Sequence, residues 1–177
     1  MGKIILTSNG LENNAIIKIL EESNKKAIII PTADREKENS YDSLATKKLL
    51  SKLNFDVNFF DVEYDNNIKK LLYYDMVYFA GGDPFRLMHF IKPFAVKKIL
   101  SDILVDDKII VGTSAGAMVL GTTIELPSLF SQVEEQFSED GFEGIALVEI
   151  NVCPHYKQSL SRFENLEQRI CNFFTKM

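Results

Sequence analysis

The stretch IIVGTSAGAMVL, residues 109–120, decides how the chain is expected to fold. It passes from a β-branched apolar run, typical of a buried strand, through small residues into a second apolar run. Its segment GTSAG fits the pattern G-x-S-x-G, in which a sharp strand-to-helix turn holds the serine exposed. The pattern leaves two interpretations of Ser114 open: a nucleophile at the beginning of a helix, or an N-cap in an ordinary small-residue turn.

Strands and helices alternate on both sides of this turn. Short apolar runs predict strands at residues 3–7, 26–32, 56–62, 75–82, 108–112 and 146–152. Helical spacing of apolar residues predicts helices at 11–23, 41–54, 66–74, 85–91, 94–104 and 159–174. This alternation is typical of βαβ units, so we expect an α/β three-layer sandwich, a mostly parallel sheet with helices on both faces, in a single domain of residues 1–177. Residues 122–144 form a long, weakly patterned loop, and such loops are often functional.

Composition excludes several classes of function. The 177 residues carry a net charge of -5, which argues against nucleic-acid binding, and no apolar run is long enough to span a membrane. The amino terminus has no secretory signal pattern, and the two cysteines have no spacing typical of zinc or of a redox pair. We therefore expect a cytoplasmic protein that uses neither a metal nor an organic cofactor.

Three segments follow predicted strands, where parallel sheets place functional loops. They contain Gly81, Gly82 and Asp83; the GTSAG turn; and Cys153, Pro154 and His155. Backbone amides of Gly82 or its neighbour and of Ala115 are candidates for binding an oxyanion beside Ser114. Asp83 also suits a helix N-cap, because Pro84 follows it.

A serine nucleophile needs a base, and the chain has only two histidines. His89 lies inside a helical pattern and reads as a packing or surface residue, so His155 is the preferred base. A carboxylate should orient its imidazole, but spacing alone does not choose among the six acids between Ser114 and His155. These are Glu125, Glu134, Glu135, Glu139, Asp140 and Glu143.

Taken together, GGDPFRL, GTSAGA and CPHY make the chain resemble the peptidase E (aspartyl dipeptidase) family of serine peptidases, which has a class I glutamine amidotransferase-like fold. The resemblance covers nearly the whole chain. It implies that Ser114 is the nucleophile, His155 the base, and Gly82 and Ala115 the oxyanion donors. Gly81 and Asp83 become candidate substrate-binding residues.

The chain departs from the aspartyl-specific branch of that family at two positions. Where that branch has its catalytic Asp, this sequence has Leu129; a Ser-His-Glu branch carries a Glu at the spacing of TIE, which implies that Glu125 is the third catalytic residue. The Arg that binds the substrate carboxylate is replaced by Leu166, and Arg162 or Arg169 is the candidate substitute. The family usually continues into further strands, so we expect either a smaller sheet or a homodimer that covers its edge.

The sequence therefore predicts a serine peptidase that hydrolyses short peptides. Two alternatives remain open: an esterase or amidase that uses the same residues on a non-peptide substrate, and a catalytically inactive small-molecule binding or regulatory protein of the same fold.

Overall fold

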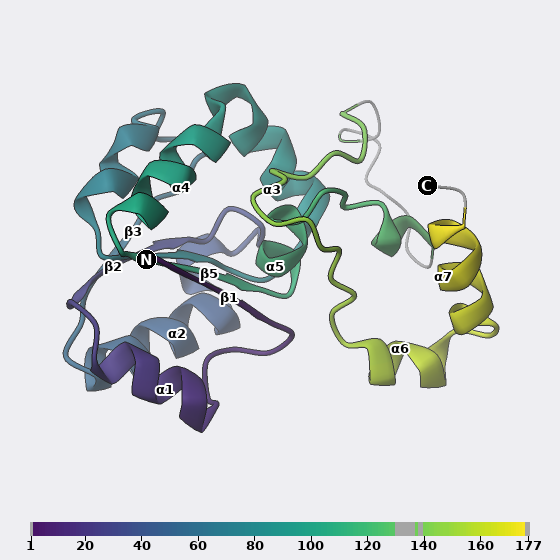
Figure 1. The fold of residues 1–177 in the computed structure, drawn as a ribbon, viewed down its shortest axis with the longest axis horizontal. Helices are drawn as coiled ribbons and strands as arrows, with labels where there is room; N and C mark the ends of the chain where they lie inside the picture. Colours follow the sequence, from purple (N-terminus) through teal and green to yellow (C-terminus); the bar gives the residue numbers. More distant parts are fainter. Residues whose placement is uncertain (1, 130–136, 138–139, 176–177) are drawn as a thin grey trace.

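The computed structural model describes residues 2–129, 137 and 140–175, and its centre is a five-stranded sheet (Figure 1). The strands are β1 (Lys3–Thr7), β2 (Lys26–Ile30), β3 (Asp56–Phe59), β4 (Met76–Phe79) and β5 (Ile109–Thr113). They lie in the order β1-β5-β4-β2-β3, and every neighbouring pair is parallel. All residues of β4 and β5 are buried, which explains their continuous apolar sequences.

Helices cover both faces of the sheet, as Figure 1 shows. On one face lie α1 (Asn14–Glu21) and α2 (Tyr41–Lys52); on the other lie α3 (Pro84–Ile91), α4 (Val96–Val105) and α5 (Ala115–Val119). Successive strand residues point to opposite faces, so Tyr78 and Val111 join one apolar cluster while Phe79 and Ile110 join the other. The predicted three-layer α/β fold is confirmed, and its sheet is entirely parallel.

Side chains cap the N-termini of α2 and α3 by accepting hydrogen bonds from backbone amides of the first turn. Ser40 Oγ accepts a hydrogen bond from Ser43 N at 3.2 Å at the start of α2. Asp83 accepts one from Phe85 N at 2.8 Å at the start of α3, where Pro84 is the first residue. The described residues also include the short 3₁₀ segments η1 (Lys37–Asn39), η2 (Ile68–Tyr73), η3 (Lys92–Phe94) and η4 (Leu126–Leu129). The capping expected for Asp83 is therefore present.

The strand predicted at residues 146–152 is wrong. This segment has no strand conformation; instead its amides complete hydrogen bonds at the end of α5. Ala146 N donates to Gly121 O at 2.8 Å, and Leu147 N donates to Leu120 O at 3.0 Å. The carbonyls at a helix end need partners, and these bonds direct the segment away from the sheet.

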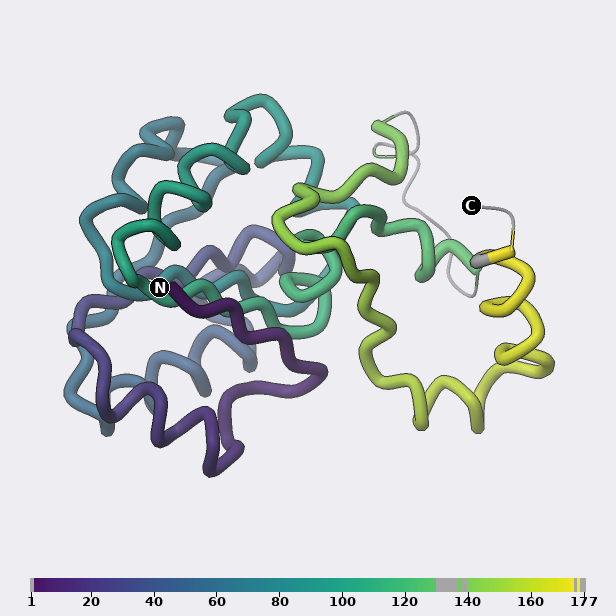
Figure 2. Tube along the Cα trace, viewed as in Figure 1, coloured from purple at the N-terminus to yellow at the C-terminus, as the bar shows by residue number. Residues whose placement is uncertain are grey.

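The single helix predicted at residues 159–174 is two helices, α6 (Tyr156–Arg162) and α7 (Leu166–Phe174). Phe163 is extended, with φ −123° and ψ 122°, and Asn165 adopts the left-handed conformation with φ 55°. Asparagine tolerates that conformation better than most residues, so the amphipathic pattern continues across a break in the backbone. The trace in Figure 2 shows both helices extending away from the sheet.

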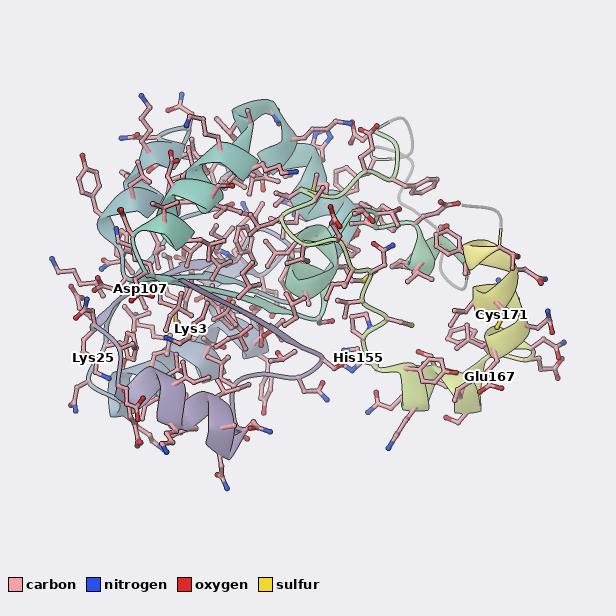
Figure 3. The ribbon with its side chains drawn as sticks, in the orientation of Figure 1. Lys3, Lys25, Asp107, His155, Glu167 and Cys171 are labelled. Atoms are coloured by element: carbon pink, nitrogen blue, oxygen red, sulfur yellow. The ribbon has the colours of Figure 1, made fainter. Side chains whose placement is uncertain are left out.

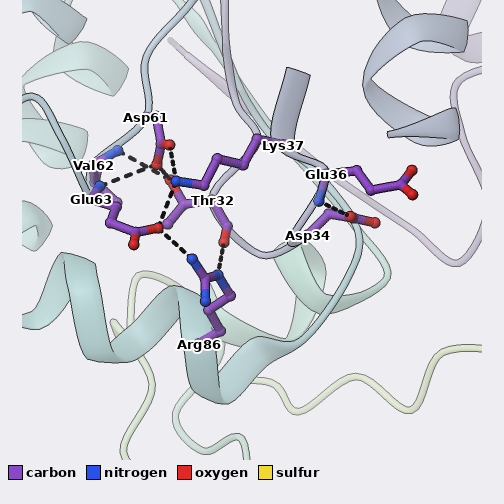
Figure 4. A network of polar contacts seen from close by, with 8 residues as sticks. All are labelled: Thr32, Asp34, Glu36, Lys37, Asp61, Val62, Glu63 and Arg86. Carbon is purple, nitrogen blue, oxygen red and sulfur yellow. Dashed lines mark hydrogen bonds and ion pairs between the residues drawn. The ribbon is translucent and has the colours of Figure 1, made fainter. Parts of the chain in front are cut away.

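A largely buried ion cluster joins the loop after β2, the loop after β3, and α3 (Figure 4). Lys37 Nζ lies 2.6 Å from both Asp61 Oδ2 and Glu63 Oε2, and Glu63 also pairs with Arg86. Arg86 Nε donates to Thr32 O at 3.0 Å. Burial lowers the pKa of Lys37, but the nearby side chains of Asp61, Glu63 and Tyr64 stabilise the ammonium, outweigh that effect and raise the pKa. The cluster fixes the beginning of α3 against the end of β2.

Candidate active site

Ser114 follows β5 directly and adopts a backbone conformation that non-glycine residues rarely use, with φ 50° and ψ −113°. Its amide donates to Thr7 O at 2.9 Å, which fixes it to the neighbouring strand. Its carbonyl accepts from Met118 N at 3.1 Å and so begins α5. Its side chain makes no capping hydrogen bond, and the geometry is that of a nucleophile elbow.

Glycines make this turn sterically feasible. A Cβ on Gly112 would lie 2.5 Å from Gly116 O, and a Cβ on Gly116 would lie 2.1 Å from Phe79 O. Both distances are far below van der Waals contact, so a larger residue would push α5 away from β4 and β5. The small residues around Ser114 are therefore required by helix-sheet packing as well as by the turn.

His155 belongs to the carboxyl-terminal segment, which brings its side chain close to Ser114. Figure 3 labels His155 between the ends of the strands and the carboxyl-terminal helices. Its Nε2 lies 3.2 Å from Ser114 Oγ, which is hydrogen-bond distance. The residue is left-handed, with φ 56°, and its carbonyl accepts from Ser159 N at 2.9 Å as α6 begins. The backbone conformation of His155 thus turns the chain at the point where the imidazole meets the serine.

The other histidine lies in a different environment. His89, on α3, places Nδ1 2.6 Å from Asp140 Oδ2 and packs against Phe137 at a ring distance of 5.1 Å. Lys92 holds the same loop by donating to Asp140 O at 2.9 Å. Asp140, one of the acids that spacing left open, therefore contacts His89 instead of His155.

The loop after β4 contributes Gly82 to the same two pockets that Ser114 lines. Gly82 has φ +136°, and a Cβ there would lie 2.5 Å from Ala33 C and O. Asp83 N donates to Ala33 O at 2.8 Å, which fixes the loop on the far side of Gly82. Within the described part of the chain, Gly82 N has no hydrogen-bond partner. Ala115 is the first residue of α5, so its N–H also has no acceptor within the helix.

Glu125 immediately precedes η4 and is half-buried. Its amide donates to Thr123 Oγ1 at 3.1 Å, and its carbonyl accepts from Ser128 Oγ at 2.7 Å. Among the residues that the structure describes, no hydrogen bond joins a carboxylate to His155. The competing acids Glu134, Glu135 and Glu139 lie outside the described residues.

Two pockets meet at Ser114 and His155. The first, of about 510 Å³, lies towards α6; Gly82, Asp83, Ala115, Leu126 and Arg162 are among the residues that line it. The second, of about 480 Å³, lies towards α2; Gly81, Gly82, Glu12, Asp34 and Asp42 are among its lining residues. The structure thus brings Gly81, Gly82, Asp83, Ala115 and Arg162 to the same site. Arg169 is exposed on α7 and lines neither pocket.

Sequence reasoning missed Asp42, whose carboxylate reaches the loop after β4. Gly81 N donates to Asp42 Oδ2 at 2.8 Å. In the sequence, Asp42 looks like an ordinary acidic residue in the first turn of a predicted helix, where its negative charge interacts favourably with the helix dipole. Only the tertiary packing of α2 beside that loop distinguishes it.

The described residues contain no group of three or more His, Cys, Asp or Glu side chains arranged to hold a metal ion. In the same residues, no helix has the length and apolar character needed to cross a membrane. Both cysteines are free, and burial raises the pKa of the Cys153 thiol, which lines the first pocket. Low thiolate content makes Cys153 a poor competitor of Ser114 for the role of nucleophile.

The chain is similar to known peptidases. Residues 4–176 match the family model described as "Peptidase family S51". The "Uncharacterized peptidase Lmo0363" of Listeria monocytogenes is 26% identical, covering 82% of this chain and 72% of that protein. The "Uncharacterized peptidase Lin0382" of Listeria innocua is 28% identical, with coverage of 86% and 73%.

Two solved structures have a similar fold. A "Putative Peptidase E Protein" from Listeria monocytogenes EGD-e superposes with a TM-score of 0.81 at 23% identity, covering 97% of this chain and 87% of that one. A peptidase from an acI-B1 Actinobacterium gives a TM-score of 0.66 at 20% identity, with coverage of 97% and 75%.

Proposed function

The chain belongs to peptidase family S51, a family of serine peptidases, and from this we propose that it hydrolyses short peptides with Ser114 as nucleophile and His155 as base. The observation that carries the proposal is the 3.2 Å distance between Ser114 Oγ and His155 Nε2 at a strained strand-to-helix turn. Small pockets on both sides of this pair favour short substrates over folded proteins.

In the proposed reaction, His155 takes the proton of Ser114 as Oγ attacks the scissile carbonyl. The carbonyl oxygen gains negative charge in the tetrahedral intermediate, and the amides of Gly82 and Ala115 donate hydrogen bonds to it. The protonated imidazole then gives its proton to the leaving amine, and water hydrolyses the acyl-enzyme by the same steps. The departing fragment occupies one pocket and the acyl fragment the other.

We assign the orienting carboxylate to Glu125. Its neighbour Leu126 lines the pocket that contains Ser114 and His155, so the Glu125 backbone lies next to the site. A carboxylate in this role holds the tautomer that accepts a proton at Nε2 and stabilises the imidazolium. Arg162 lines the same pocket and is assigned to the substrate carboxylate, for which a guanidinium is well suited.

A fluorophosphonate probe and a library of dipeptides and tripeptides with mass-spectrometric readout test the proposal together. Wild-type protein should react with the probe at Ser114 and cleave a subset of the library, and Ser114→Ala should do neither. Ser101→Ala, whose hydroxyl donates to Lys97 O on α4, is the matched control and should retain both activities. Folded wild-type protein that fails to react and to cleave would contradict the proposal and support a binding protein. Cleavage of ester substrates only would support an esterase.

The same assay tests Glu125. Replacing it by Gln should lower turnover by up to about 10⁴-fold without altering the fold, because the imidazole loses its anionic partner. Glu143→Gln is the matched control, since Glu143 lies in the same loop and pairs with Lys92 at 3.1 Å on the surface. Near wild-type turnover of Glu125→Gln would exclude this assignment.

A further inference from the structure

Asp42 connects α2 to the loop that carries the candidate oxyanion donor. It is the second residue of α2, and its carboxylate extends to the loop after β4. Asp42 Oδ2 accepts from Gly81 N at 2.8 Å, and both carboxylate oxygens lie 3.2–3.3 Å from Tyr78 Oη. One half-buried side chain therefore contacts both the end of β4 and the glycine next to Gly82.

Tyr78 extends this connection to the nucleophile. The residue is fully buried, and its Oη lies 2.9 Å from Thr113 Oγ1. Thr113 Oγ1 in turn lies 2.9 Å from Thr7 Oγ1. Burial and the nearby charge of Asp42 raise the pKa of Tyr78, so the phenol stays protonated and remains a hydrogen-bonding partner throughout the physiological pH range. Thr113 immediately precedes Ser114, so a continuous polar chain runs from Gly81 to the residue before the nucleophile.

The loop is fixed on both sides of Gly82, whereas the Gly82 amide itself has no hydrogen-bond partner among the residues that the structure describes. Gly81 N is held by Asp42, and Asp83 N is held by Ala33 O at 2.8 Å. A Cβ on Gly81 would lie 3.5 Å from Ser114 Cβ, so this loop packs directly against the nucleophile. The Gly81 N–H belongs to the Ala80–Gly81 peptide and the Asp83 N–H to the Gly82–Asp83 peptide, so the two hydrogen bonds fix the planes on both sides of the Gly81–Gly82 peptide. The peptide between them, whose plane sets the direction of the Gly82 N–H, therefore has less freedom to rotate.

We propose that Asp42 is a positioning residue that holds the Gly81–Gly82 peptide so that the Gly82 amide points to the oxyanion. The inference rests on the proposed function, because it assigns Asp42 to the same reaction. The role requires an acceptor for Gly81 N and a partner for Tyr78 Oη, and it does not require charge. An asparagine satisfies both, since its Oδ1 accepts from Gly81 and its Nδ2 donates to Tyr78.

Kinetics of Asp42→Ala and Asp42→Asn on a cleaved peptide test this role. Loss of an oxyanion donor costs about 10²–10³ in kcat, so a misdirected donor in Asp42→Ala should lower kcat by about 10–100-fold and leave KM within about threefold. Asp42→Asn should restore kcat to within about fivefold of the wild type. Asp102→Ala, on α4 across the sheet, is the control and should keep wild-type constants.

Two kinetic outcomes would overturn the inference. Unchanged kcat in Asp42→Ala would show that the Gly81 bond does not position the donor. A raised KM that Asp42→Asn fails to restore would show that the charge of Asp42 binds the substrate directly, for example a substrate ammonium group in the second pocket. Thermal melting of each variant separates these outcomes from simple unfolding.

Amide NMR signals test the geometry without turnover. In Asp42→Ala, the Gly81 amide should exchange faster with solvent and the Gly82 amide resonance should move, and both should return towards wild-type values in Asp42→Asn. Unchanged signals in Asp42→Ala would overturn the inference even in an active enzyme. If wild-type protein cleaves no peptide while the signals respond as expected, the proposed function fails and the positioning of the Gly82 amide stands.

Discussion

At the scale of one residue, the backbone conformation that exposes the Ser114 hydroxyl is also one that lowers the stability of the fold. A non-glycine residue at positive φ costs about 1–3 kcal/mol, and the fold retains this strain at its candidate nucleophile. The cost follows from the Cβ atom, which serine needs in order to carry its hydroxyl. The conformation that exposes Oγ is therefore maintained by the rest of the fold.

Replacing Ser114 by Gly should stabilise the protein relative to Ser114→Ala. Both variants lose the hydroxyl, but only glycine removes the Cβ that makes φ 50° unfavourable. We expect the free energy of unfolding, measured in urea, to be about 1 kcal/mol higher for Ser114→Gly than for Ser114→Ala. Equal values would show that the turn stores no strain.

At the scale of elements, the ion cluster of Lys37, Asp61, Glu63 and Arg86 joins the beginning of α3 to the ends of β2 and β3. The side chains of Lys37 and Glu63 are only 16% and 20% exposed, whereas those of Lys98 and Asp102 in the surface pair of α4 are 83% and 50% exposed. Burial limits solvent screening, so the cluster should matter far more to stability than the surface pair.

Glu63→Gln should lower the free energy of unfolding by about 2–4 kcal/mol, because it leaves Lys37 and Arg86 largely buried with one carboxylate fewer. The matched Asp102→Asn on the surface should change it by less than about 0.5 kcal/mol. Urea unfolding of both variants at low and high salt decides the comparison. A similar small effect at both sites would mean that the cluster contributes no more than the surface pair.

Local patterns predicted the elements of the sheet well and the carboxyl-terminal segment poorly. Strands such as β5 are predicted correctly from sequence, because a parallel strand that is buried on both faces has a continuously apolar sequence. Residues 146–152 look similar in sequence, yet their amides bond to the end of α5, a choice that no local pattern encodes. The break at Asn165 is hidden for a related reason, since the amphipathic spacing continues across it.

In the candidate active site, too, local sequence patterns predict some features, whereas tertiary contacts decide others. The proximity of Ser114 and His155 could be predicted from sequence because both residues directly follow apolar segments in patterns typical of strand ends. Asp42 cannot, because its contact with Gly81 spans 39 residues and depends on how α2 packs. The pairing of Asp140 with His89 was equally invisible to spacing.

At the scale of the whole molecule, α6 and α7 lie to one side of the sheet and form the α6–α7 wall beside the first pocket (Figure 1). Arg162 and Phe163 line the first pocket from α6 and the turn after it, and α7 packs against η4. Phe173 on α7 is only 7% exposed and belongs to the apolar cluster of the α3–α5 face. Its side chain should therefore hold the wall of the pocket in place.

Phe173→Ala should loosen this wall without unfolding the sheet. We expect limited proteolysis to cut near the break between α6 and α7 faster than in the wild type, while the body of the protein stays resistant. Peptide cleavage should fall because the pocket loses its wall. Tyr73→Ala, which removes an aromatic ring that is 79% exposed, is the control and should change neither. Uniform digestion of the whole variant chain would show that α7 supports the fold globally.

The meeting of two pockets at one serine has a consequence for the fate of the acyl-enzyme. In the proposed reaction, departure of the first product would leave one of the two pockets vacant while the acyl fragment stayed in the other. The next molecule to enter the vacant space then determines the product. Water completes hydrolysis, but an amine of suitable size would form a new amide bond there. Because one pocket would be emptied in each catalytic cycle, the proposed site would also act as a transferase whenever amines are abundant.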